Sequence, residues 1–134
     1  MKRGGDSDEK TSEMSGIFYL EKKYNLLDSG TFWITNTPEI ESKFEGAACN
    51  RICSFVVLEN KVTGFKYIHM NTHLDHVSTE AQNLGGNLIL SKANELKQKY
   101  PDIKIVITGD FNQSVDGEAV KILSANGFVS ANTV

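Results

Sequence analysis

Three side chains that could carry out hydrolytic chemistry follow two apolar segments of this sequence. Asp110 directly follows the segment IKIVITG, and Asn112 comes two residues later. His73 comes two residues after the segment FKYIHMN. A carboxylate with a nearby amide and imidazole can hold a hard divalent cation and orient a water molecule. Asp110 would then serve as ligand or base, Asn112 would orient the water or an anion, and His73 would stabilise developing negative charge.

The elements that carry these residues predict that they meet. Residues 103–108 are mostly β-branched and are bounded by Pro101 and Gly109, which is typical of a central strand. Residues 65–71 form a second apolar run, and apolar residues spaced near 3.6 predict a helix from a cap at Thr79 to about Lys99. A strand–helix–strand unit normally makes a right-handed crossover between parallel strands. The carboxyl ends of both strands, and the residues after them, should therefore share one edge of a sheet.

Two glycines interrupt the expected helix. Gly85 and Gly86 each cost about 1 kcal/mol relative to alanine in a helix interior. A close approach of the helix backbone to the sheet is the expected compensation.

The rest of the chain predicts short strands and one more helix. A hairpin is expected from residues 17–20 and 24–27, with a turn at 28–30, a third strand at 31–34, a strong strand at 51–58, a helix from Asp116 to Asn126 and a last strand starting at Phe128. Residues 1–15 are polar and Gly-rich, and predict a loop or disordered tail, leaving 16–134 as the folded part.

Composition narrows the class of protein. The 134 residues suffice for one globular domain, and a net charge of −3 with an estimated pI of 5.6 excludes a sequence-wide basic field for nucleic acid. No apolar run is long enough to span a membrane. The extended spacing of Cys49 and Cys53 puts them too far apart for a disulfide, so a reducing, cytoplasmic setting is expected.

The same residues resemble a known family. NTHLDH at 71–76, TGDFN at 108–112, GTFWITNTPEI at 30–40, IFY at 17–19 and Arg51 together resemble the endonuclease/exonuclease/phosphatase superfamily of metal-dependent phosphoesterases. The resemblance implies an α/β fold in which a β-sandwich is flanked by helices. It also implies that His73 is the active-site histidine and that Arg51 contacts phosphate.

The resemblance further implies a reaction and a cofactor. Asp110 and Asn112 match the acid and the amide that position the attacking water and help to bind metal. Water would attack a phosphodiester or phosphomonoester with the help of Mg²⁺ or Mn²⁺. The substrate could be nucleic acid, a nucleotide, a sugar phosphate or a lipid head group.

Several family motifs have no counterpart in this sequence. The N-terminal asparagine strand, the Gln-Glu pair and the C-terminal Asp-His pair are missing, so residues 16–134 resemble an incomplete domain. We therefore expect weak activity or none from this chain alone. The alternative is a non-catalytic remnant or a split-domain fragment that binds a complementing chain. A third possibility, a zinc-binding module, follows from the closeness of His69, His73 and His76 in the sequence.

Overall fold

Four strands and two helices make up the regular structure of the chain. The computed structural model describes residues 1–5 and 12–131, and expectations for residues 6–11 and 132–134 lie outside the described residues. In chain order the elements are β1 (Tyr24–Trp33), β2 (Ile52–Asn60), β3 (Lys66–His73), α1 (Thr79–Lys99), β4 (Lys104–Asp110) and α2 (Glu118–Ala125).

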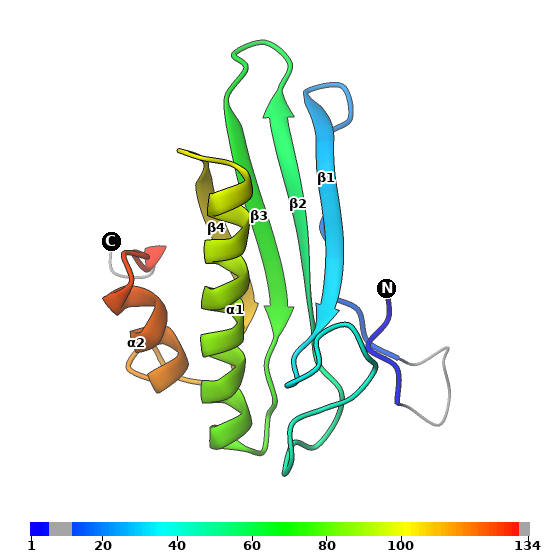
Figure 1. Ribbon diagram of the computed structural model, residues 1–134, viewed down its shortest axis with the longest axis vertical. Helices are drawn as coiled ribbons and strands as arrows, with labels where there is room; N and C mark the ends of the chain where they lie inside the picture. The colour runs from blue at the N-terminus through cyan, green and yellow to red at the C-terminus, as the bar shows by residue number, and fades with distance from the viewer. Residues whose placement is uncertain (6–11, 132–134) are drawn as a thin grey trace.

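The four strands form one sheet in the order β1-β2-β3-β4 (Figure 1). β1 and β2 are antiparallel, as are β2 and β3, whereas β3 and β4 are parallel. The predicted crossover from β3 through α1 to β4 is therefore confirmed. It brings the carboxyl ends of β3 and β4 to the same edge of the sheet.

Helix α1 covers one face of this sheet, and α2 lies beside α1 (Figure 1). Alternate side chains of β2 and β3 point toward α1 and are buried, among them Cys53, Val57, Ile68 and Met70. They share one core with Ile89 and Ala93 of the helix. The intervening residues of β3 and β4, among them His73 and Asp110, point to the opposite face, which we call the outer face.

The glycines of α1 do allow a close approach, but its main partner is α2 rather than the sheet. A Cβ on Gly86 would lie 2.9 Å from the Cα of Ala119 in α2. A Cβ on Gly85 would meet the side chains of Leu74 and Ile34, at 2.9 and 3.0 Å. The missing side chain of Gly86 thus lets α1 and α2 pack with their backbones nearly in contact.

Several predicted boundaries were wrong. Residues 17–20 form no strand, so the expected hairpin is absent. The expected second strand, turn and third strand are instead one continuous strand, β1, in which the register with β2 shifts between Leu26 and Asp28. Such a β-bulge accommodates turn-forming residues without ending the strand, because pairing with β2 continues on both sides. The cap of α1 is Ser78 rather than Thr79. Phe128 and its neighbour belong to no strand, since the chain leaves α2 through Gly127 without reaching the sheet.

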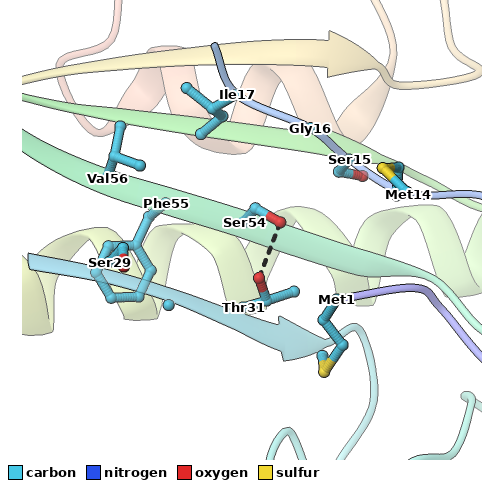
Figure 2. A pocket seen from close by; sticks show the side chains of 11 residues that line it. Met1, Met14, Ser15, Gly16, Ile17, Ser29, Thr31, Ser54, Phe55 and Val56 are labelled. Carbon is cyan, nitrogen blue, oxygen red and sulfur yellow. Dashed lines mark hydrogen bonds between the residues drawn. The ribbon is translucent and has the colours of Figure 1, made fainter. Parts of the chain in front are cut away.

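The N-terminal residues that the structure describes contain no helix or strand but dock on the sheet. The backbone N–H of Arg3 donates to the carbonyl of Glu13 at 3.0 Å, and the indole of Trp33 donates to the carbonyl of Arg3 at 2.8 Å. Further along, the side chain of Asn71 donates to the carbonyl of Gly16 at 3.0 Å. Figure 2 shows the segment from Met14 to Ile17 running across the outer face. These hydrogen bonds place the segment before β1 beside the end of β3.

Candidate active site

His73 and Asp110, the last residues of β3 and β4, lie side by side. They are register partners in the parallel pair, so both side chains point to the outer face. His73 Nε2 is 3.7 Å from Asp110 Oδ2, and the backbone N–H of Leu74 donates to the carbonyl of Asp110 at 2.9 Å. The Asp110 side chain is 64% exposed and that of His73 is 35% exposed. Both groups are therefore accessible to a ligand, as their predicted positions after parallel strands require.

Asn112 is held between the two strand ends. Its backbone N–H donates to Asp110 Oδ1 at 2.8 Å, and its side-chain Nδ2 donates to the carbonyl of Leu74 at 3.0 Å. The residue has a positive φ of 51°, a conformation that asparagine tolerates better than most residues. Its Oδ1 is left as an acceptor that can take a hydrogen bond from water or bind a cation.

Gln82, on the first turn of α1, holds together the loop after β3 and the loop after β4. Its side chain is buried, and Nε2 donates to the carbonyl of Asp75 at 2.8 Å and more weakly to that of Asn112 at 3.4 Å. Gln113 extends this network by donating to Gln82 Oε1 at 2.9 Å and accepting from the backbone N–H of Ala119 at the start of α2. Both helices thus support the loops that carry the candidate residues.

Arg51 lies next to the His73–Asp110 pair, although it does not contact Asp110. The residue is only 5% exposed, and its Nη1 donates to Glu13 Oε2 at 2.7 Å. Its Nη2 is 3.0 Å from His76 Nδ1. Since arginine has no acceptor, Nη2 donates and this ring nitrogen of His76 carries no proton.

Glu13 is the residue of this site that sequence reasoning missed. Its Oε2 accepts from Arg3 Nη1 at 2.9 Å and from Arg51 Nη1 at 2.7 Å, and lies 3.5 Å from His73 Nδ1. His73 therefore sits between two carboxylates, those of Glu13 and Asp110. Glu13 belongs to a polar segment without hydrophobic periodicity, so no local pattern marked it. The one available signal was the need of a buried arginine for a counter-charge.

The surroundings of His73 favour its neutral form. Burial lowers the pKa of His73, and the positive charge of Arg51 lowers it further, against opposite effects of Glu13 and Asp110. The net direction is downward from the usual value of 6.5. At neutral pH the imidazole can therefore donate through one nitrogen and accept through the other.

The residues at the strand ends are compatible with a hard divalent cation. Mg²⁺ commonly takes one or two protein carboxylates and fills its remaining positions with water and phosphate oxygens. Asp110 offers an exposed carboxylate whose Oδ1 already accepts a backbone N–H, which leaves Oδ2 available. The side-chain oxygen of Asn112 is a second neutral ligand of the same hard type. This donor set fits Mg²⁺ or Mn²⁺ better than zinc.

A second group of possible ligands is less suitable for a metal. Within residues 1–5 and 12–131, Cys49, Asp75 and His76 bring ligand atoms within 4.8 Å of one another. Asp75, however, accepts backbone N–H groups from Val77 and Ser78 on one oxygen and from Ala48 on the other. Burial alone would raise the pKa of Asp75, but these hydrogen bonds bring it below its usual value. The carboxylate is thus occupied as an anchor for the loop before α1.

The three histidines do not converge on one zinc site. His69 Nε2 lies 2.8 Å from Thr108 Oγ1, His73 lies between two carboxylates, and His76 accepts from Arg51. Each imidazole ring therefore has a different partner, either at the ends of the strands or on the outer face of the sheet. This geometry gives no support to a zinc-binding module built on these histidines.

Comparisons with known proteins agree with the fold. The sequence is 28% identical over 113 residues to RNA exonuclease NGL1 of Saccharomyces cerevisiae. The match covers 78% of this chain and 31% of the relative. A mannosyl-6-phosphatase of Bacteroides thetaiotaomicron superposes with a TM-score of 0.77 at 30% identity, covering 81% of this chain and 40% of that chain. An endonuclease/exonuclease/phosphatase of Bacteroides vulgatus superposes at 0.74 with 36% identity, covering 83% and 42%.

The chain thus spans about two fifths of the length of these solved structures and under a third of the yeast relative. No family model matches the sequence. Among the described residues, neither helix is long and apolar enough to cross a membrane.

Proposed function

The chain is a partial domain of the endonuclease/exonuclease/phosphatase fold, and from this premise we propose that its site takes part in divalent-metal-dependent hydrolysis of phosphate esters. The observation that carries the proposal is the meeting of His73 and Asp110 at the carboxyl ends of parallel strands, 3.7 Å apart. Relatives with hydrolase names support the reaction class. Phosphodiesters and phosphomonoesters are both included.

Each of the three strand-end residues has a role in this proposal. Asp110 is exposed and would accept the proton of an attacking water, with the side-chain oxygen of Asn112 orienting that water. His73, neutral at pH 7, would donate a hydrogen bond to the phosphate oxygen on which negative charge grows. A bound Mg²⁺ or Mn²⁺, held by Asp110 and Asn112, would supply charge neutralisation for the phosphate.

We expect turnover by this chain alone to be weak. Besides Asp110, the nearby carboxylates are already engaged: Glu13 accepts from two guanidinium groups, and Asp75 accepts three backbone N–H groups. Of these three carboxylates, Asp110 alone would therefore be free to bind a cation. One carboxylate is at the lower end of what protein Mg²⁺ sites provide.

A direct test is hydrolysis of a chromogenic phosphomonoester and phosphodiester with Mg²⁺, with Mn²⁺ and with chelator. We expect slow, metal-dependent turnover that Asp110→Asn reduces at least 100-fold, in line with the usual contribution of a positioned acid or base. Asp116→Asn is the matched control, because it makes the same change on an exposed residue before α2. Equal rates in both variants, or rates unaffected by chelator, would refute the proposal.

A specific observation also favours the alternative of a partner-binding fragment. β4 is an edge strand, its outer-face residue Val106 is 48% exposed, and a groove of about 1050 Å³ runs along β4 to α2 and Phe128. Exposed apolar strand edges tend to pair with further chain. If this role holds, a complementing polypeptide will co-elute with the chain in size-exclusion chromatography and raise its metal-dependent turnover.

The free cysteines support the expected cellular setting. Cys49 and Cys53 form no disulfide, and burial raises the pKa of the Cys53 thiol to about 12. Such a thiol is unreactive, and two unpaired cysteines suit a reducing compartment. A cytoplasmic location therefore remains our proposal.

A further inference from the structure

Two turns project together from one end of the sheet, opposite to the end at which β3 stops at the candidate site (Figure 1). One turn precedes β1 at residues 20–23, and the other joins β2 to β3 and spans residues 59–66 with the flanking strand ends. The backbone N–H of Lys61 donates to the carbonyl of Lys23 at 2.9 Å, and Lys61 Nζ donates to the carbonyl of Glu21 at 2.7 Å. The two turns therefore form one surface, which we call the turn surface.

Exposed apolar side chains lie on the turn surface. Val62 is 92% exposed, Leu20 is 61% exposed and Phe65 is 55% exposed. Phe65 stacks on Tyr67 with ring centroids 6.3 Å apart, and Tyr67 meets Tyr24 edge-on at 5.8 Å. A row of three aromatic rings thus lies behind the apolar tips. Aromatic and aliphatic side chains in this combination are favoured at the boundary between a lipid bilayer and water.

Lysines surround these apolar tips. Four exposed lysines belong to the turn surface, against two glutamates: Lys22, Lys23, Lys61 and Lys66, and Glu21 and Glu59. The turn surface therefore has a formal charge of +2, and since the whole chain carries −3, the remainder of the chain carries −5. An anionic surface attracts this end of the molecule and repels the rest, which fixes the orientation in which the two approach each other.

The combination of side chains favours a lipid surface over a nucleic acid. Leu20 and Val62 can bury their aliphatic groups among acyl chains while the neighbouring ammonium groups stay at the level of the head groups. A single-stranded nucleic acid would use the lysines and the aromatic rings, but it would leave these two aliphatic side chains in water. The exposed aliphatic tips are therefore explained by a bilayer and not by a polynucleotide.

We propose that the turn surface attaches the chain to an anionic phospholipid bilayer, with Leu20, Val62 and Phe65 inserted and the lysines at the head groups. β3 runs from Lys66 on the turn surface to His73 at the candidate site, a length of roughly 23 Å at about 3.3 Å per residue. The candidate site is thereby held away from the bilayer and open to dissolved substrates. The attachment does not depend on the proposed hydrolysis, so either can fail without the other.

The test is co-sedimentation of the full chain with vesicles of phosphatidylcholine alone and of an equal mixture of phosphatidylcholine and phosphatidylserine. The chain should bind the mixed vesicles only, and added salt should weaken the binding. Val62→Gln should weaken it about tenfold, because one valine is lost from the apolar contact. Val129→Gln is the matched control, because it makes the same change on a valine that is 89% exposed after α2.

A charge reversal tests the lysines separately. Lys22→Glu should weaken binding to the mixed vesicles roughly 25-fold, since each unit of charge at an anionic membrane contributes about fivefold. Lys121→Glu, on an exposed lysine of α2, is its control. Absence of binding to the mixed vesicles, or equal losses in a variant and its control, would overturn the proposal. Binding of a single-stranded oligonucleotide but not of the vesicles would also overturn it, and would assign the lysines to nucleic acid.

Discussion

The side-chain amide of Asn112 donates to the carbonyl of Leu74 at 3.0 Å and so ties the loop after β4 to the loop after β3. This bond joins the two strand ends on which His73 and Asp110 lie. Together with the backbone bond from Leu74 to Asp110, it makes the spacing of the candidate catalytic pair a property of the loops as well as of the sheet.

Replacement of Asn112 should therefore destabilise the contact between the loops after β3 and β4. Asn112→Gly keeps a residue that accepts the positive φ but loses the bond to Leu74, and should cost about 1 kcal/mol in the free energy of unfolding. Asn112→Ala adds backbone strain and should cost about 1 kcal/mol more. Urea denaturation measures both values. Equal stability of the two variants would show that the positive φ carries no cost here.

Gly86→Ala should push α1 and α2 apart. The added Cβ would lie 2.9 Å from the Cα of Ala119, and neither backbone can yield without moving a helix. We expect a loss of about 1–3 kcal/mol in unfolding free energy, typical of overpacking. Asn87→Ala, one position along on the exposed side of α1, should be neutral or slightly stabilising. An unchanged urea midpoint for Gly86→Ala would contradict the close helix contact.

His69 should titrate below its usual range. Burial lowers the pKa of His69 from 6.5, because the charged imidazole loses hydration beside Thr108. A lowered folded-state pKa gives stability that is present above pH 6.5 and is lost as the pH falls through the folded value. NMR titration should find this pKa below 6.5. The stability difference between the wild type and His69→Gln should also shrink toward acid pH; a difference that grows would contradict the sign.

Asp28 should add a second, more acidic pH dependence. Hydrogen bonds from Lys99 at 2.7 Å and Tyr100 at 2.8 Å lower the pKa of Asp28 below 3.8. Its contribution to stability is therefore present above about pH 3.8 and is lost as the pH falls through the folded pKa. Asp28→Asn should destabilise the chain at pH 5–7 and lose its effect in stronger acid. Asp102→Asn makes the same change at an exposed turn and is the control.

The part of the fold that the sequence predicted is the part with strong periodicity. The apolar runs of β3 and β4, the 3.6-residue spacing of α1 and the breaker Pro101 together predicted the crossover, and with it the meeting of His73 and Asp110. β1 was misread because Asp28 and its neighbours favour a turn locally, whereas pairing with β2 absorbs them as a bulge.

The position of Glu13 depends on a different kind of information. It meets Arg51 across 38 positions of sequence, through a segment with no repeating pattern. Contacts of this kind are decided by where the folded sheet ends, so local propensity does not reveal them.

The parallel pairing of β3 and β4 has a kinetic consequence. Leu74 and Asn112 are 38 positions apart, so the contact between the ends of β3 and β4 forms only after α1 has closed a long loop across the sheet. The antiparallel β1–β2–β3 meander does not depend on this crossover. We therefore expect the meander to assemble early and β4, with the candidate site, to join in the last cooperative step. Native-state hydrogen exchange should therefore find the amides of β4 opening before those of β2, and the chain would lose its site well before it loses its fold.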